Sequence, residues 1–310
     1  MLIMDFEKEL AEEVSYCTQT VERYLPGAYK DAESPRRKTI EEAMEYSVMG
    51  GGKRLRPMFI HQGAKMYGAA PSLYEPFMAA LEMIHSYSLV HDDLPAMDND
   101  RYRRGRLTTW AVYGDGMAVL AGDALLNFAY ETAMKALDAP EAADPQVQGR
   151  ICRALRVLAG NAGIYGMVGG QCADVEAEKK NLDIDEDMLL YIHRNKTAAL
   201  IDSGLRIGGI LGGAPEEDDA RMHRIAQAIG VAFQIQDDIL DVTGTSEELG
   251  KTAGKDAAEG KKTYVTLHGL QTSKEKVRAL TDGALNEFDS LSQKNDFLRH
   301  LLTALVTRTR

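Results

Sequence analysis

The feature that most constrains the fold of this chain is the spacing of its apolar residues by three and four, which recurs from end to end of its 310 residues. This spacing places apolar side chains on one face of a helix. Its first instance is formed by Phe6, Leu10, Val14, Cys17 and Val21. No two-residue alternation is sustained, so a sheet is not expected. The pattern predicts an all-α helical bundle.

The periodicity divides the chain into a series of expected helices. One is expected to begin at Ser34, with Pro35 in its first turn, and to run toward the glycines at 50–52. Hydrophobic residues make up 45% of the sequence and no Pro/Ser-rich linker divides it, so residues 1–310 are expected to form a single domain. The other expected helices, followed by shorter ones near the C-terminus, cover 54–68, 73–94, 116–138, 147–166, 185–212 and 217–242.

Composition argues against several kinds of partner. The net charge of −11 disfavours nucleic acid binding, which requires a basic face. No apolar run approaches the roughly 18 residues of a membrane helix, and no signal or transit peptide is recognisable, so a cytosolic protein without membrane insertion is expected. The three cysteines, Cys17, Cys152 and Cys172, share no CxxC spacing, which predicts buried, reduced thiols and neither disulfides nor a zinc site.

Two of the expected helices, 73–94 and 217–242, are apolar around most of their circumference and end in aspartates. Helices of this kind are buried, and carboxylates at their ends must face a cavity or a cation. The sequence therefore predicts a deep pocket lined by two central helices of the bundle.

The first acidic cluster contains Asp92, Asp93 and Asp98. Pro95 is expected to end the helix just after Asp93, so that non-helical backbone brings Asp98 back toward Asp92. In an unbroken helix, residues six apart would point about 240° apart and could not share one ion. The proline is thus part of the expected site.

The second acidic cluster needs no break, because Asp237 and Asp241 are four apart and lie on one helical face, with Gln234 one turn before Asp238. Carboxylate oxygens suit magnesium, which substrate phosphate usually completes, and no nearby cysteine or histidine favours zinc. One such cluster alone is better explained as a solvated helix end. Two clusters at the ends of apolar helices favour a metal site.

Basic residues near the acidic clusters could bind the phosphate groups of a substrate. The glycines at 50–52 expose flexible backbone beside Lys53, Arg54 and Arg56, which suits an anion, with a plain surface loop as the alternative. The arginines within 101–106 follow the first acidic cluster, and their forked side chains match phosphate oxygens, although such a run can also be a solvated face. Carboxylates for metal and cations for phosphate together predict a site for more than one diphosphate, where a departing diphosphate is stabilised electrostatically.

These motifs carry a family resemblance that runs over nearly the whole chain. The sequence resembles the bacterial farnesyl diphosphate synthase branch of the trans-isoprenyl diphosphate synthases. The segments that carry the likeness are GGKRLRP at 51–57, IHSYSLVHDDLPAMDND at 84–100, RRG at 103–105, GGQCADVE at 169–176, KT at 196–197, FQIQDDILD at 233–241 and GKKTY at 260–264. Val265 departs from the pattern, which commonly has proline there, and this makes the placement of Lys261 less certain.

The resemblance implies roles for particular residues. Magnesium, with three ions per active site, would be held on the allylic diphosphate by Asp92, Asp98 and Asp237. The same diphosphate would be contacted by Arg103, Lys196 and Lys261, helped by Thr197 and Gln234. Isopentenyl diphosphate would be bound by Lys53, Arg56, His85 and Arg104. Supporting positions, the first two of them at the metal, would be Asp93, Asp241, Gln171 and Asp174.

The implied reaction is ionisation of an allylic C–O bond, attack by the isopentenyl double bond and loss of a proton, inside a dry apolar pocket. Dimethylallyl and geranyl diphosphate would be the allylic substrates, and a homodimer is implied. Tyr87 lies roughly 7.5 Å along the helix from Asp92 and, with Ser88 beside it, is similar to the chain-length position of farnesyl synthases.

Three alternative functions remain open. A geranylgeranyl diphosphate synthase would share the same motifs. A terpene cyclase would not need Lys53 and Arg56, and a non-catalytic helical subunit would have lost motif residues.

Overall fold

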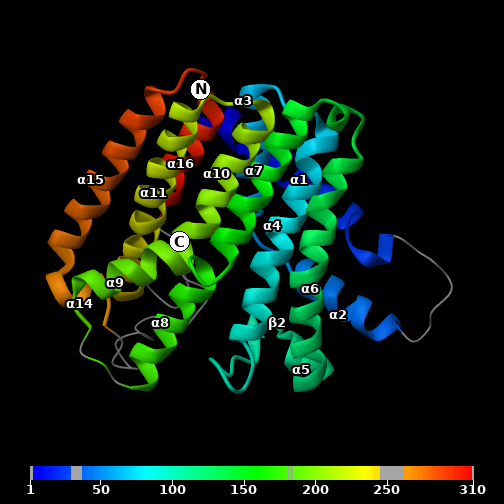
Figure 1. Cartoon of the computed structure of the whole chain (residues 1–310). Coiled ribbons are helices and arrows are strands. Elements are labelled where there is room, and N and C mark those ends of the chain that lie inside the picture. Colours follow the sequence, from blue (N-terminus) through cyan, green and yellow to red (C-terminus); the bar gives the residue numbers. More distant parts are fainter. Residues whose placement is uncertain (1–2, 29–36, 181, 183, 245–261, 309–310) are drawn as a thin grey trace.

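A computed structural model gives the structure of residues 3–28, 37–180, 182, 184–244 and 262–308 (Figure 1). Nearly all regular structure within these ranges is helical, which confirms the all-α prediction. The long helices are α1 (Ile3–Arg23), α2 (Lys38–Val48), α3 (Leu55–Tyr67), α4 (Pro71–Asp92), α6 (Asp115–Met134), α7 (Pro145–Ala162), α8 (Met167–Lys179), α10 (Ala199–Gly212), α11 (Glu216–Thr243), α15 (Leu270–Asp289) and α16 (Asp296–Thr307). The short ones are α5 (Thr109–Tyr113), α9 (Glu186–Ile192), α14 (Tyr264–His268), a π-helix (His193–Ala198) and 3₁₀ turns at Pro26–Ala28, Lys135–Asp138 and Pro140–Ala143.

Helix α10 lies in the middle of the bundle, where it packs against α3, α4, α7 and α11. Helix α4 packs between α3 and α6 and buries large side chains such as Phe77 and Leu81, as expected for a helix that is apolar nearly all round. Helix α11 is partly exposed in its first turns but presents no exposed residue from Ile225 to Asp241. Both helices run downward in Figure 1, so their acidic ends lie at the same end of the bundle.

The expectation that no strands form is wrong at one small place. Strands β1 (Tyr102–Arg103) and β2 (Arg106–Leu107) form an antiparallel hairpin. Its two central residues, Arg104 and Gly105, have φ angles of 52° and 75°, the left-handed pair that a tight two-residue hairpin turn requires. The turn is too short to produce an alternating pattern in the sequence, which is why periodicity did not predict it.

Several helix boundaries differ from the prediction. The expected helix over 185–212 is one continuous path that changes from α9 to the π-helix and then to α10. Helix α8 was not predicted, because Gly169 and Gly170 in its sequence are weak helix formers. The C-terminal helices are not all short, since α15 has 20 residues. The start expected at Ser34 lies outside the described residues.

The prediction of three buried thiols is correct for Cys17 and wrong for Cys152 and Cys172, which are exposed. Cys152 lies on the amphipathic helix α7 about 100° around the axis from the buried Ile151, outside the stripe of buried residues Ile151, Ala154, Leu158 and Ala162. Cys172 lies on the face of α8 that borders a cavity.

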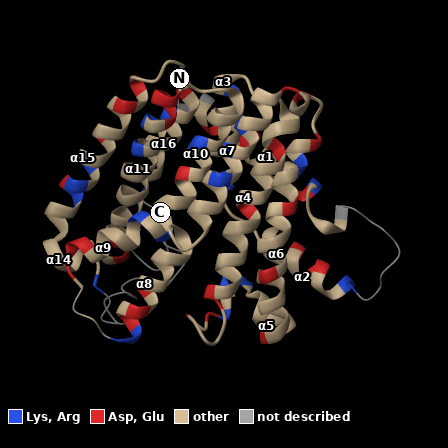
Figure 2. Cartoon of the chain, in the orientation of Figure 1, with Lys and Arg blue, Asp and Glu red and all other residues tan. Residues whose placement is uncertain are grey.

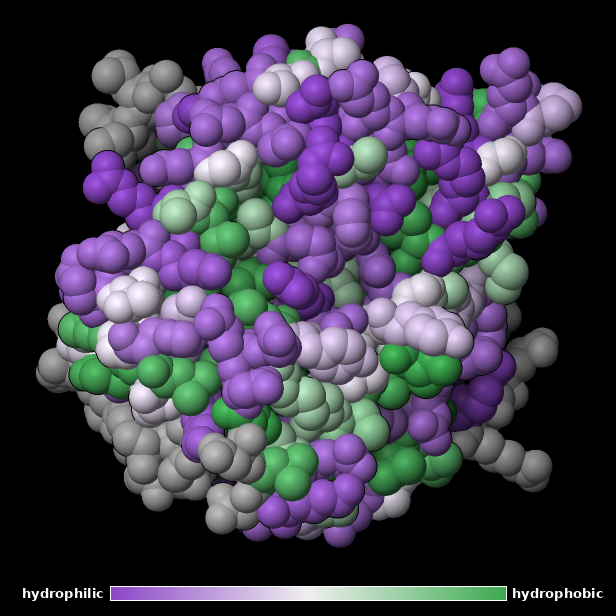
Figure 3. Space-filling view, turned by 60° about the vertical axis from the view of Figure 1, so that its left-hand side comes forward, coloured by the Kyte–Doolittle hydropathy of each residue, from purple (hydrophilic) through white to green (hydrophobic). Residues whose placement is uncertain are grey.

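None of the helices in the described ranges combines the length and the apolarity needed to cross a bilayer. Charged residues of both signs meet at the lower end of α4 (Figure 2). On the face shown in Figure 3, hydrophilic residues dominate the upper part, and hydrophobic residues are more frequent toward the lower end, where α4 and α11 terminate.

Candidate active site

The first acidic cluster is formed by a sharp return of the backbone. Helix α4 ends at Asp92, and the backbone N–H of Asp98 donates to the carbonyl of Asp92 at 2.9 Å. The helix ends before Pro95, and the turn is closed by the backbone N–H groups of Met97 and Asn99, which both donate to the carbonyl of Leu94. The predicted return of Asp98 toward Asp92 is therefore confirmed at the level of the backbone.

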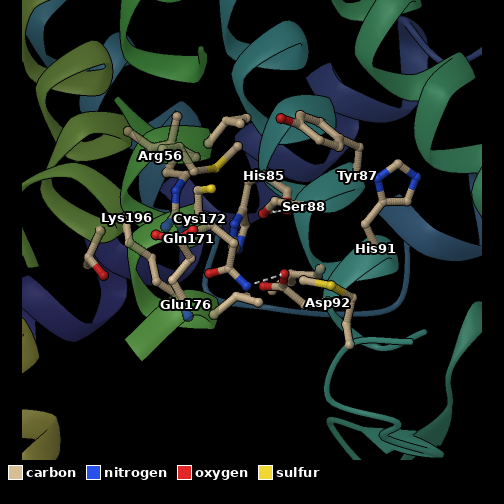
Figure 4. Close-up of a pocket in the computed structure, with 17 residues that line it drawn as sticks. Arg56, His85, Tyr87, Ser88, His91, Asp92, Gln171, Cys172, Glu176 and Lys196 are labelled. Carbon is tan, nitrogen blue, oxygen red and sulfur yellow. Dashed lines mark hydrogen bonds between the residues drawn. The ribbon is translucent and has the colours of Figure 1, made fainter. Parts of the chain in front are cut away.

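Asp92 lies at the edge of a cavity of about 460 Å³ (Figure 4). Its carboxylate accepts a hydrogen bond from the side-chain amide of Gln171 on α8 at 2.8 Å. Burial raises the pKa of Asp92 to about 6, with Asp98 acting in the same direction and Lys196 against it. A partly buried carboxylate with acidic neighbours is stabilised by a cation.

The second acidic cluster shows a stronger need for a cation. Asp241 is 4% exposed, and within the part of the chain that the structure describes neither oxygen of its carboxylate has a hydrogen-bond partner. A buried, unpartnered carboxylate is costly, and a metal ion is one way of offsetting that cost. Asp238 differs, because its carboxylate accepts the backbone N–H of Tyr264 at 2.9 Å and thereby fixes the start of α14.

The carboxylate oxygens of these aspartates are the kind of ligand that magnesium prefers. Within the described ranges, however, no three acidic, histidine or cysteine side chains are gathered closely enough to hold a metal by themselves. Magnesium commonly binds through one or two carboxylates and completes its shell with water and substrate phosphate. The arrangement therefore suits an ion that arrives with a diphosphate.

The π-helix lies between α8 and α11 and packs against both. Lys196 lines the same cavity as Asp92, and its ammonium donates to the carboxylate of Asp174 on α8 at 2.5 Å. The hydroxyl of Thr197, the next residue, donates to Gln234 on α11 at 3.0 Å. Two consecutive residues of the π-helix thus bind side chains of two different helices, α8 and α11. π-Helical turns are frequent at functional sites because they redirect successive side chains.

Two glycines allow this turn to lie so close to its neighbours. A Cβ at Gly170 of α8 would lie 2.2 Å from the backbone nitrogen of Lys196, and one at Gly230 of α11 would lie 2.2 Å from the Cβ of Ala198. Real Cβ atoms do not approach other atoms so closely. The position of Lys196 and Thr197 therefore depends on glycine at both places.

The expected isopentenyl diphosphate residues gather around the start of α3. Arg56 and His85 line the cavity, while Lys53 is exposed on the glycine-rich segment. Arg104 donates to the backbone carbonyl of Gly51. Burial lowers the pKa of His85 well below its usual value, and the neighbouring arginines lower it further, so this histidine is neutral near pH 7.

Two expected residues have partners that the sequence did not indicate. The guanidinium of Arg103 forms a two-pronged contact with Asp93, with Nε–Oδ1 at 2.8 Å and Nη2–Oδ1 at 2.5 Å. Asp237 accepts from Arg308 near the C-terminus, whose guanidinium also lies 3.8 Å from the centre of the Phe233 ring. Lys261 lies outside the described residues.

Sequence reasoning also missed the buried ion pair between Arg54 and Glu82. A signal was present, because Glu82 is a carboxylate in an apolar helix, one turn before His85.

Known proteins are similar to this chain over most of its length. A family model described as polyprenyl synthetase matches residues 37–301. The farnesyl diphosphate synthase of Geobacillus stearothermophilus is 42% identical over 259 residues, covering 84% of each chain. A heterodimeric geranylgeranyl pyrophosphate synthase large subunit of Arabidopsis thaliana is 44% identical over 255 residues, covering 81% of this chain and 68% of the relative.

Among solved structures, an FPP/GFPP synthase from Zymomonas mobilis superposes with a TM-score of 0.84 at 31% identity, covering 99% of this chain and 100% of that one. The expected fold and resemblance are thereby confirmed. The chain belongs to the polyprenyl synthetase family and is a trans-prenyltransferase that condenses isopentenyl diphosphate with allylic diphosphates.

Proposed function

We propose that the product of this prenyltransferase is farnesyl diphosphate, made from isopentenyl diphosphate and dimethylallyl or geranyl diphosphate. The observation that carries this proposal is Tyr87. It is 6% exposed, lies on the cavity wall, and is on the same helix as Asp92 but farther from the acidic end (Figure 4). A bulky ring about 7.5 Å along the helix from the diphosphate end would stop a growing isoprenoid tail early.

Each group of residues would have its own role in this reaction. Magnesium, when bound, supplies charge that stabilises the leaving diphosphate. Asp92, Asp98 and Asp237 would hold it, with Asp93 and Asp241 in support. Lys196 and Thr197 would orient the allylic diphosphate from the π-helix, together with Gln234, Arg103 and Lys261. Apolar groups of the cavity, such as Val175 and Leu200, would exclude water from the allylic cation.

The second substrate would bind at the start of α3. Lys53, Arg56 and Arg104 would attract its diphosphate, and the neutral imidazole of His85 would donate a hydrogen bond without adding charge. Gln171 and Asp174 would hold Asp92 and Lys196 in place, as their hydrogen bonds indicate.

Geranylgeranyl diphosphate is the second candidate product, because relatives named geranylgeranyl pyrophosphate synthase match at 43–45% identity. The experiment is to incubate the purified chain with magnesium, dimethylallyl diphosphate and labelled isopentenyl diphosphate and to separate the products by chromatography. Farnesyl diphosphate as the main product supports the proposal. A main product one isoprene unit longer assigns the second candidate, and no product at all would indicate a non-catalytic subunit.

Replacing Tyr87 with alanine is expected to shift the main product beyond farnesyl diphosphate, because the cavity would become deeper by the volume of the ring. Product chromatography measures the shift. Tyr87→Phe is the matched control, since it keeps the ring and removes only the hydroxyl, which has no hydrogen-bond partner among the described residues. Unchanged product length in Tyr87→Ala would refute the role of the ring.

The homodimer, the cytosolic location and the single domain over residues 1–310 are further parts of the proposal. Support for a dimer comes from α6, which exposes Val119, Leu120 and Met134 to solvent. An apolar helix with an uncovered apolar face is typical of an oligomer interface.

We expect Leu120→Glu to reduce the mass measured by light scattering to that of a monomer, whereas Leu182→Glu, at an exposed leucine outside α6, leaves the mass unchanged.

A further inference from the structure

We propose that Glu82 is a positioning residue for the second substrate. Through Arg54, it holds the segment Gly51–Arg56 in the shape that presents Lys53 and Arg56 to the diphosphate of isopentenyl diphosphate. This inference deepens the proposed function and rests on it. Neither Glu82 nor Arg54 is expected to touch substrate.

The first observation is the isolation of the pair from solvent. The guanidinium of Arg54 lies 2.7 Å from the carboxylate of Glu82, and the two side chains are 3% and 4% exposed. Buried ion pairs are weak contributors to stability, because desolvation offsets much of the attraction. The Arg54–Glu82 pair beside the apolar helix α4 is therefore better explained by its effect on the orientation of the segment Gly51–Arg56 than by its contribution to the stability of the fold.

The second observation is the backbone of Arg54. It precedes the first residue of α3 and has a φ of 50° and a ψ of 32°, in the left-handed region. A non-glycine residue there is strained and needs contacts that hold it. This conformation connects the glycine-rich segment to the helix that carries Arg56, so a change at Arg54 would alter the direction of the segment.

The third observation is a shared acceptor. The backbone carbonyl of Gly51 accepts from Arg54 at 3.3 Å and also from Arg104 in the β1–β2 turn. Glu82 fixes the Arg54 end of this arrangement and lies on α4 one turn before His85. A single carboxylate is thus connected to the glycine-rich segment, to α3 and to the hairpin.

The fourth observation is electrostatic. The pKa of Arg56 is lowered to about 10, chiefly by burial; Glu82 acts against this shift, and Arg104 acts with it. Glu82 has the same effect on Arg104. The carboxylate therefore offsets repulsion among cations that must stay together before an anionic substrate arrives.

The test is Glu82→Gln, which keeps the shape of the side chain and removes its charge. We expect the KM for isopentenyl diphosphate to rise by roughly tenfold to a hundredfold, the loss typical of a charge-assisted hydrogen bond, while the KM for the allylic substrate changes by less than about twofold. Asp202→Asn is the matched control. Asp202 is also buried and paired with an arginine, Arg206 at 3.2 Å, but it does not line the cavity.

Two further measurements keep the test decisive. If Glu82→Gln does not fold, the double variant Arg54→Leu with Glu82→Leu replaces the pair by apolar groups and is expected to fold with the KM for isopentenyl diphosphate still raised. Amide hydrogen exchange over residues 50–56 of the substrate-free protein is expected to quicken in Glu82→Gln and not in Asp202→Asn, and this readout does not need turnover.

The outcomes separate the two proposals. Absence of product from the wild-type chain would contradict the proposed function. Amide hydrogen exchange over residues 50–56 would still test whether Glu82 holds this segment in place. An unchanged KM for isopentenyl diphosphate in a folded Glu82→Gln, an equal rise of both KM values, or a wild-type KM in the double variant would each overturn the role of Glu82. Unchanged amide exchange over residues 50–56 would do the same.

Discussion

Replacing Asp92 with asparagine is expected to lower the rate of condensation at saturating substrate by about a thousandfold, the scale of losing one group that stabilises the leaving charge. Asparagine keeps the shape of the side chain and can still accept from Gln171, whose amide lies 2.8 Å from Asp92. What is lost is the negative charge at the end of α4. We therefore expect Mn²⁺ binding in the presence of pyrophosphate, followed by electron paramagnetic resonance, to weaken together with the rate.

Glu178→Gln is the control for this experiment, because Glu178 is an exposed acid on α8 that does not line the cavity. Its rate and its Mn²⁺ binding are expected to equal those of the wild type. A loss of less than about tenfold in Asp92→Asn, with unchanged Mn²⁺ binding, would show that the α4 end holds no catalytic ion.

Replacing Gly170 with alanine is expected to reduce the rate by about a hundredfold without removing any polar group, because displacement of a positioning element by about 1 Å has effects of that size. The added Cβ would overlap the backbone nitrogen of Lys196, so the π-helix must move. Overpacking of this kind also destabilises by about 1–3 kcal/mol. Steady-state kinetics and thermal unfolding measure the two effects separately.

Gly283→Ala is the matched control, because a Cβ added at this helical glycine of α15 meets no atom of the described ranges within 4 Å. Alanine is favoured over glycine in a helix, so this variant is expected to be more stable by about 0.5–1 kcal/mol and fully active. Wild-type kinetics in Gly170→Ala would mean that the close approach of α8 does not position Lys196.

The sequence predicts best what is determined locally. The helix carrying Asp92 ends where Pro95 requires, and Asp98 returns toward it through a turn of a few residues. The second cluster follows from helical spacing alone, since Asp237 and Asp241 are one turn apart on α11. The burial of α4 follows from its apolar circumference.

The rest depends on contacts between distant segments, which helical periodicity does not encode. The π-helix His193–Ala198 contains one apolar residue, Ala198, so apolar spacing gives no signal that its hydrogen-bond register differs from that of the α-helices on either side. The pairs Arg54–Glu82 and Asp237–Arg308 join residues 28 and 71 positions apart. Helix α8 was missed because Gly170 weakens a local helix signal while serving a tertiary contact.

We expect the acidic ends of α4 and α11 to bind one common diphosphate. The most direct measurement is anomalous diffraction at the manganese edge from crystals grown with Mn²⁺ and a thiolodiphosphate analogue of the allylic substrate. We predict manganese peaks at both Asp92 and Asp237, with a single diphosphate between them in contact with Lys196. Manganese at one aspartate cluster alone, or a diphosphate bound to one helix end and out of reach of the other, would contradict the account.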